Sequence, residues 1–185
     1  MSQEPHHQFD LLLEFDADQV SPSLSWKTKP EAMASVGPGA GVLQLARHGH
    51  IGLIITGTGT QAPSIGHSPY TGFTVRQCAL YAQPKLLRCS AMADHAQYAV
   101  PMPFAGTPVA LHELKPEFTS SEQLQSQILT VRKKWEGQLV SAGIPGRWVL
   151  TVVLTVDIAR KSLEPAPARV FQFDIELLID PGALV

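Results

Sequence analysis

The sequence predicts a mainly β protein, an antiparallel, jelly-roll-like β-sandwich with one amphipathic helix at about residues 120–142. Two segments, 9–16 and 170–180, alternate apolar and polar residues, as half-buried strands do. Further short apolar runs are separated by turns rich in Pro and Gly. Helical periodicity is clear in one segment only. Many short strands with a single helix are typical of a sandwich.

The composition fits one globular domain over residues 1–185, since 44% of the residues are hydrophobic. The net charge of −2 argues against nucleic-acid binding, which needs a dense basic face. No apolar stretch approaches the ~18 residues of a membrane span. Residues 1–7 lack the basic and apolar regions of a secretory signal, so we expect a cytoplasmic protein.

The N-terminal half contains four expected strands, residues 9–16, 23–29, 42–47 and 51–56. In the first, the inward-facing set is Phe9, Leu11, Leu13 and Phe15. Gly57-Thr58-Gly59-Thr60 follows the fourth. A phosphate-binding loop would need a helix directly after it, whereas Pro63, Gly66 and Pro69 follow. We therefore interpret these four residues as a turn.

The middle of the chain predicts a hairpin of strands 73–81 and 86–91 around a loop at 82–85. In that register Cys78 and Cys89 lie opposite each other, close enough for a disulfide after small adjustment. Two buried free thiols are favoured in a reducing cytoplasm, because two cysteines are too few for a disulfide framework. Short strands at 98–100 and 109–114 follow.

The expected helix begins with Thr119-Ser120-Ser121-Glu122, which fits a capping box. Its apolar stripe is Leu124, Ile128, Val131, Trp135 and Leu139, and Gly143 and Pro145 end it. Beyond it, residues 148–158 are apolar on both faces, as in a central strand. We expect them to form an antiparallel hairpin with 170–180, whose inward set is Phe171, Phe173, Ile175, Leu177 and Ile179.

The order of these features resembles the bacterial inclusion-body protein family of the AidA/PixA type. The similar stretches are LLLEFDAD at 11–18, GAGVLQLARHGHIGLIITGTG at 39–59, and the closing WVLTVVLTV and FQFDIELLID. The chain departs from the family in its Ile179-Asp180-Pro181 ending and its long expected helix. The resemblance implies a β-sandwich that accumulates or assembles in the cytoplasm without an established catalytic activity, and it carries over no functional residues.

Two groups of residues could bind a metal. His48 and His50 share one strand face, with His67, His95 and Asp94 as further ligands, but solvated histidines are favoured for lack of ligand spacing. The acidic terminal strands carry Asp10, Glu14, Asp174 and Glu176, which could hold calcium, as in β-sandwich lectins, if the strands were neighbours. Separate solvated faces are favoured, because facing like charges destabilise a sheet.

No catalytic residue and no cofactor is indicated, since the sequence has no nucleophile-elbow motif and no His near either cysteine. Residues 32–112 are poor in charge, which favours a surface for association; the charged residues are Arg47, Arg76, Lys85, Arg88 and Asp94. We expect a non-enzymatic, cytoplasmic homo-oligomer. The alternatives are a sandwich that binds calcium, a glycan or another small molecule, and a metal-dependent enzyme that uses the histidines.

Overall fold

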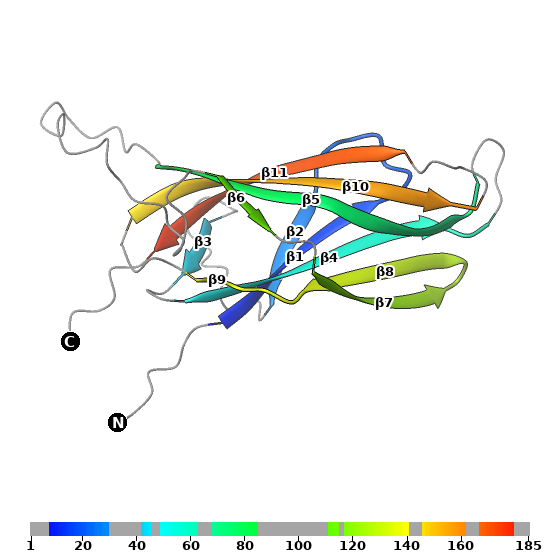
Figure 1. The fold of residues 1–185 in the computed structure, drawn as a ribbon, viewed down its shortest axis with the longest axis horizontal. Helices are drawn as coiled ribbons and strands as arrows, with labels where there is room; N and C mark the ends of the chain where they lie inside the picture. The colour runs from blue at the N-terminus through cyan, green and yellow to red at the C-terminus, as the bar shows by residue number, and fades with distance from the viewer. Residues whose placement is uncertain are drawn as a thin grey trace, which may run out of the picture.

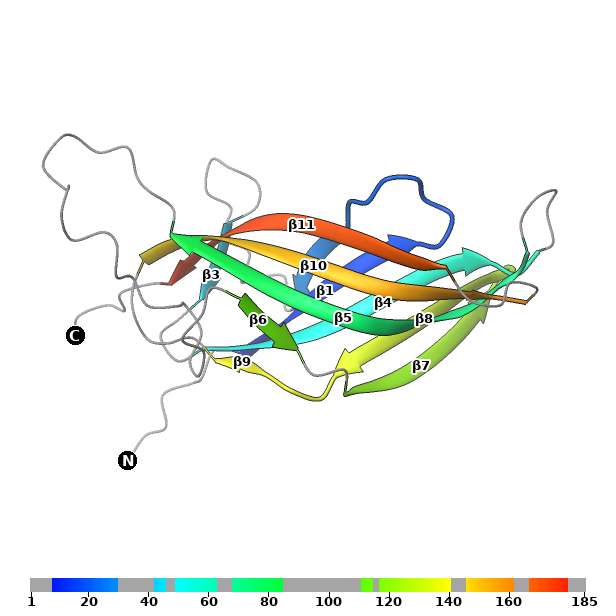
Figure 2. The same cartoon turned by 45° about the horizontal axis from the view of Figure 1, so that its top comes forward.

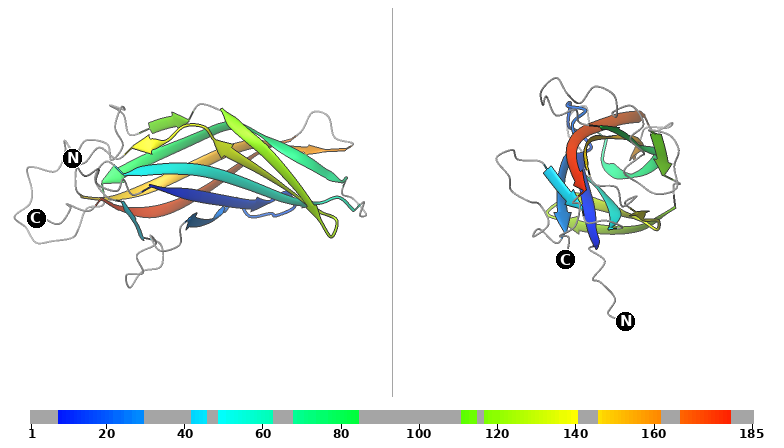
Figure 3. Two further views of the ribbon diagram at one scale, coloured as in Figure 1. Left: turned by 90° about the horizontal axis from the view of Figure 1, so that it is seen from below. Right: turned by 90° about the vertical axis from the view of Figure 1, so that its left-hand side faces the viewer.

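The computed structural model describes residues 8–29, 42–45, 49–62, 68–84, 111–114, 117–140, 146–161 and 167–179. Within these ranges every regular element is a β-strand, and the strands form two packed sheets (Figures 1 and 2). The predicted mainly β sandwich is therefore confirmed. The left view of Figure 3 shows the longest strands of both sheets running along the length of the molecule.

Sheet A has six strands in the order β2-β1-β4-β8-β7, with β9 pairing with β4. Their bounds are β1 Gln8–Asp16, β2 Ser25–Lys29, β4 His50–Thr60, β7 Phe118–Gln125, β8 Ile128–Trp135 and β9 Leu139–Val140. Sheet B has five strands in the order β3-β11-β10-β5-β6. Their bounds are β3 Val42–Leu45, β5 Tyr70–Pro84, β6 Leu111–Leu114, β10 Gly146–Arg160 and β11 Ala168–Ile179. Most neighbours are antiparallel; β1 with β4 and β11 with β3 are parallel.

The apolar faces of the two terminal strands point inward, as predicted, and the two strands face each other across the core. Leu11, Leu13 and Phe15 of β1 are buried, whereas the side chain of Phe9 lies outside the described part. The whole predicted inward set of β11 is buried as well. Phe15 stacks on Phe171 with ring centroids 4.8 Å apart. β1 belongs to sheet A and β11 to sheet B, so this stack joins the two sheets.

β10 and β11 form the predicted antiparallel hairpin, in register from Gly146 opposite Ile179 to Asp157 opposite Ala168. β10 lies between β11 and β5, which confirms it as a central strand. Every second residue from Trp148 to Ile158 is buried and points into the core. The residues between them are half-buried on the outer face, which explains why the sequence of β10 is apolar on both faces.

The helix predicted at 120–142 is wrong in the described residues. Residues 118–135 form the hairpin β7–β8, which pairs with β4 through β8. The turn residues Ser126 and Gln127 both have positive φ, 49° and 67°, the conformation of a two-residue hairpin turn usually made by Asn-Gly or Asp-Gly. Without that signal, the spacing of Leu124, Ile128 and Val131 looked helical, although Leu124 and Ile128 are exposed.

The turn predicted at Gly57–Thr60 is also wrong, because these residues continue β4. Gly57 and Gly59 lie on the inner face, where aromatic rings occupy the space of a side chain. A Cβ at Gly59 would lie 2.6 Å from the ring of Tyr70, and one at Gly57 2.7 Å from the ring of Phe15. The glycines therefore allow aromatic rings to approach the strand backbone closely.

The cysteine hairpin register does not hold for Cys78. The strand continues through the predicted loop as far as Pro84, and both neighbours of Cys78 in sheet B are other residues, Leu154 of β10 and Leu114 of β6. Cys78 is a buried free thiol. Cys89 and residues 98–100 lie outside the described residues.

Candidate functional site

The four carboxylates considered for calcium are divided between the two outer faces of the sandwich. Asp10 and Glu14 alternate with the inward residues of β1, and Asp174 and Glu176 alternate with those of β11. Glu14 forms an ion pair with Lys27, with 2.7 Å between Oε1 and Nζ. Asp174 accepts a hydrogen bond from the hydroxyl of Thr151. The structure therefore does not bring the two acidic strands together as one site.

The histidine pair is described at one position only. The Nδ1 of His50 lies 2.7 Å from Oε1 of Gln138, within hydrogen-bond distance. His48, His67, His95 and Asp94 lie outside the described residues. Among the described residues, no group of three His, Cys, Asp or Glu side chains could hold a metal ion.

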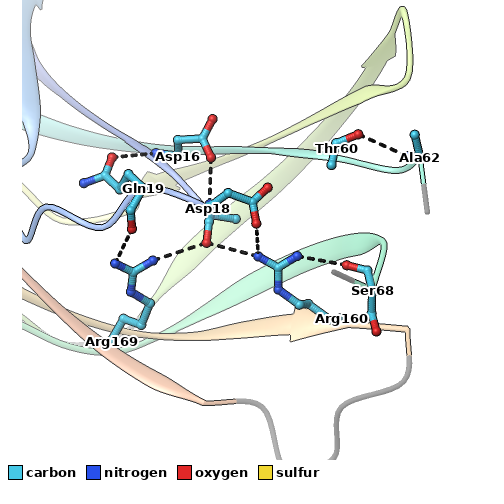
Figure 4. A network of polar contacts seen from close by, with 9 residues as sticks. Asp16, Asp18, Gln19, Thr60, Ala62, Ser68, Arg160 and Arg169 are labelled. Atoms are coloured by element: carbon cyan, nitrogen blue, oxygen red, sulfur yellow. Dashed lines mark hydrogen bonds and ion pairs between the residues drawn. The ribbon is translucent and has the colours of Figure 1, made fainter. Parts of the chain in front are cut away.

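The acidic residues at the end of β1 belong to a network that joins the two sheets (Figure 4). Arg160 at the end of β10 donates to the carbonyls of Ala17 and Ser68, at 3.1 and 2.9 Å, and forms an ion pair with Asp18. Its side chain is only 9% exposed. Asp16 in turn accepts the backbone N–H of Asp18 at 2.7 Å. These carboxylates are used in structural contacts and hold the β1–β2 connection in place.

Arg169 of β11 strengthens the same connection from a second position in sheet B. Its guanidinium donates to the carbonyls of Ala17 and Gln19. It also lies over the ring of Phe171, 5.0 Å from the centroid, where a cation–π attraction adds to the contact. The side chain of Gln19 completes the loop by donating to the carbonyls of Ser21 and Ser23, at 2.7 and 2.8 Å. Sequence analysis did not find this network, because its acceptors are mostly backbone carbonyls.

Two buried ionisable groups have perturbed pKa values. Burial raises the pKa of the Cys78 thiol to about 12, so the thiol stays protonated and unreactive at neutral pH. Burial also raises the pKa of Tyr70 far above its usual 10.0; Glu122 raises it further and Arg160 lowers it. The Tyr70 hydroxyl is buried and has no hydrogen-bond partner among the described residues. Both groups have the properties of core side chains.

Among the described residues, the main strand order ends at β2 and β7 in sheet A and at β3 and β6 in sheet B, and the two-residue β9 lies beside β4. β7 is the longest, with 8 residues against 5 in β2 and 4 each in β3 and β6. Its sequence, FTSSEQLQ, contains no Lys, Arg or Pro, and Glu122 is its one charged residue. Figures 1 and 2 show β7 along the lower border of the molecule, with β8 on its other side.

The side chains of β7 are exposed on both of its faces. After Phe118, which is half-buried, every residue to Gln125 is exposed. Glu122 lies opposite the core residue Val131 in the β7–β8 ladder, so the even-numbered residues of β7 point to the inner side. Ser120, Glu122 and Leu124 are nevertheless exposed, and Leu124 is 59% exposed. Sheet B therefore does not cover the inner face of β7.

An edge strand presents a row of backbone N–H and C=O groups that can pair with another chain. Proteins usually protect such edges with short strands, lysines, prolines or covering loops. β2 follows this pattern, because it is short and carries Lys27 and Lys29. β7 is long, neutral at most positions and accessible on both faces. The edge of β7 is therefore the candidate functional site. It was missed in the sequence because these residues were predicted to be helical.

No protein-family model, curated protein or solved structure matches this chain. Among the described residues, no helix has the length and apolar character needed to cross a membrane.

Proposed function

We propose that this protein is a non-enzymatic, cytoplasmic β-sandwich that self-associates, as its resemblance in layout to the inclusion-body family implies. One observation carries the proposal, the exposed edge of β7, eight residues long and without Lys, Arg or Pro. A second copy offers the same backbone groups in the same spacing, so strand pairing between copies needs no further partner.

The low charge of residues 32–112 supports association less strongly than the sequence suggested. The described parts of this range contain β4, whose residues from Ile51 to Gly57 are all buried. They also contain β5, which lies inside sheet B between β10 and β6. A segment that forms two internal strands is poor in charge because it supplies the core. The support for self-association therefore comes from β7.

The calcium-binding and lectin-like alternative has less support. The carboxylates that suggested it lie on opposite outer faces, and Glu14 and Asp174 each have a partner within their own sheet. A site at the described ends of β1 and β11 would need these groups on one surface. The structure thus favours the association proposal over this alternative.

Sedimentation velocity over a hundredfold range of protein concentration tests the proposal. We expect the weight-average sedimentation coefficient to rise with concentration, because pairing follows mass action. The rise should persist in reducing buffer, since the pairing proposed here is not covalent. A monomer at every concentration would contradict the proposed function.

A further inference from the structure

We propose that two copies pair through β7 in one defined register, antiparallel about a two-fold axis that lies midway between their Ser121 residues. The inference rests on the proposed self-association and names its interface. The two copies would then form one continuous sheet across the axis, because sheet A of each ends at β7. A two-fold axis makes the same surface serve both copies, which closes the assembly as a dimer.

The geometry of strands limits the registers to a few. A two-fold axis perpendicular to the sheet keeps inner residues next to inner residues, so the axis must lie midway between the two copies of one β7 residue. Two registers keep seven residues of each strand paired, one centred on Ser121 and one on Glu122. Moving the centre one residue further in either direction leaves five. The choice therefore lies between Ser121 and Glu122.

Charge decides between these two registers. Centring on Glu122 would place the carboxylates of the two copies directly opposite each other, and like charges in facing positions destabilise a sheet. Centring on Ser121 places each Glu122 opposite Ser120 of the second copy instead. Serine is small and neutral, so it leaves room for the longer side chain. The Ser121 register thus avoids the one electrostatic conflict that β7 contains.

The same register gives Glu122 an opposite charge to approach. Ser120 lies opposite Lys133 in the β7–β8 ladder, so Lys133 of the second copy is one strand beyond the facing serine, on the same face. Neighbouring strands are ~4.8 Å apart, and the Glu and Lys side chains together can span two such spacings. Lys133 is half-buried over the ring of Phe73, 5.4 Å from its centroid, which restricts its position. The axis generates this pair twice.

The register also covers the exposed apolar residue of β7. Leu124, which is 59% exposed, would face Phe118 of the second copy, where opposed Cβ atoms lie ~4.5–5.5 Å apart. Phe118 is half-buried and packs against the edge of the core. In each copy Leu124 would therefore extend an existing apolar surface, and Leu124 and Phe118 would each lose exposed area at both ends of the ladder.

Cysteine cross-linking tests the register directly. Ser121→Cys should give a disulfide-linked dimer under mild oxidation, because the two-fold axis brings the two Cβ atoms into facing positions. Gln123→Cys is the matched control on the same face: two such cysteines would be ~13 Å apart along the ladder, too far to bridge. A mixture of Gln123→Cys with Thr119→Cys should cross-link, since these positions face each other.

The outcomes separate this inference from the proposed function. Wild-type protein, which contains Cys78 and Cys89, measures the background. Cross-linking of Ser121→Cys at least tenfold above both controls supports the register. Self-association in the centrifuge with equal cross-linking of Ser121→Cys and Gln123→Cys overturns the register and leaves the proposed function. No association by either method overturns both.

A charge exchange tests the pair between copies. Glu122→Lys should raise the dimer dissociation constant about tenfold, because two ion pairs are replaced by two repulsions of similar size. Combining it with Lys133→Glu should restore most of the lost affinity, since the charges are only exchanged. Melting curves at low protein concentration show whether each variant is folded. A double variant as weak as Glu122→Lys alone, although folded, would overturn the assignment of this pair.

Discussion

The two borders of sheet A are built differently, although both are edge strands of one sheet. The β1–β2 connection reaches across to sheet B, where Leu24 and Gln172 are joined by a backbone hydrogen bond and Ser23 forms a parallel bridge to Gln172. Within β2, Trp26 packs on Phe173 with a centroid distance of 6.2 Å. At the opposite border β7 pairs with β8 and exposes both faces.

The contrast shows which border of sheet A leaves its edge strand exposed. The β2 border is closed by contacts to sheet B, by two lysines and by the arginine network around Ala17. The β7 border has none of these protections among the described residues. Since both borders belong to the same sheet, the difference lies in their side chains and loops. The open border is therefore a local property that substitutions can change without altering the core.

The largest expected effect concerns the attachment of the open border to the core. Trp135 ends β8 and is 8% exposed, so Trp135→Ala should reduce the free energy of unfolding by ~3–5 kcal/mol. Leu124→Ala, on the same hairpin but exposed, should cost under ~1 kcal/mol. Urea unfolding at low protein concentration measures both. Equal effects would mean that the hairpin is not anchored through Trp135.

Arg160→Ala removes contacts that hold the β1–β2 connection at the β2 border. It removes two hydrogen bonds to backbone carbonyls and the ion pair with Asp18, around a side chain that is 9% exposed. We expect a loss of ~2–3 kcal/mol in the free energy of unfolding, because the Ser68 carbonyl and the Asp18 carboxylate lose a donor from a nearly buried guanidinium, while the Ala17 carbonyl keeps Arg169. The exposed neighbour Lys161 provides the control, and Lys161→Ala should change stability by less than ~0.5 kcal/mol. A loss below 1 kcal/mol for Arg160→Ala would show that the network does not hold this border.

Burial raises the pKa of Tyr70, and charges at both borders act on it, Glu122 of β7 and Arg160 beside the β1–β2 connection. The pKa of the folded-state hydroxyl is raised, so stability is fully present below the unfolded value of 10.0 and is lost as pH rises above it. The slope from one such group is about 1.4 kcal/mol per pH unit. Tyr70→Phe should remove this part of the alkaline loss. At pH 7 it should change stability by less than ~1 kcal/mol, because the buried hydroxyl has no partner among the described residues. If the stability of Tyr70→Phe falls between pH 10 and 11 with the same slope as that of the wild type, the burial of Tyr70 is contradicted.

A smaller effect is expected at the turn of the β7–β8 hairpin. Ser126 and Gln127 adopt positive φ without the residues that favour it. Replacing them with Asn and Gly should stabilise the protein by ~1 kcal/mol, since the turn geometry stays the same and its strain is relieved. The backbone hydrogen bond from Gln61 to the carbonyl of Gln127, at 2.8 Å, should persist. Destabilisation on thermal melting would mean that the hairpin turn has another geometry.

The sequence predicted the terminal strands and the pairing of β11 with β10, but not the partners of β1. Alternation in β1 and β11 was sufficient because their inner residues are large and apolar and their outer residues are polar. It failed for β7 and β8, where Lys133 interrupts the inner-facing series and the pairing with β4 is distant in sequence. Long-range pairing overrode the local helical spacing. The glycines of β4 were misjudged because their function depends on Tyr70 and Phe15, which lie elsewhere in the chain.

The candidate site was missed for a related reason. An edge strand is defined by the absence of a neighbour on one side, and no local pattern of residues encodes that absence. The polar residues of β7 gave no alternation, because neither of its faces is covered. The four carboxylates considered for calcium were visible by type, but a shared site would need them on one face, and the two-sheet topology places them on two.

Sedimentation velocity on two lysine variants is the most direct test of whether the protein self-associates through the β7 border. Ser121→Lys places a positive charge beside the proposed axis, opposite the same charge of the second copy. Ser25→Lys makes the same change at an exposed position of the closed β2 border. We expect Ser121→Lys to raise the dimer dissociation constant at least about tenfold, and Ser25→Lys to leave it within about twofold of the wild type. Equal weakening of the dimer by both variants, or no weakening by either, would contradict self-association through β7.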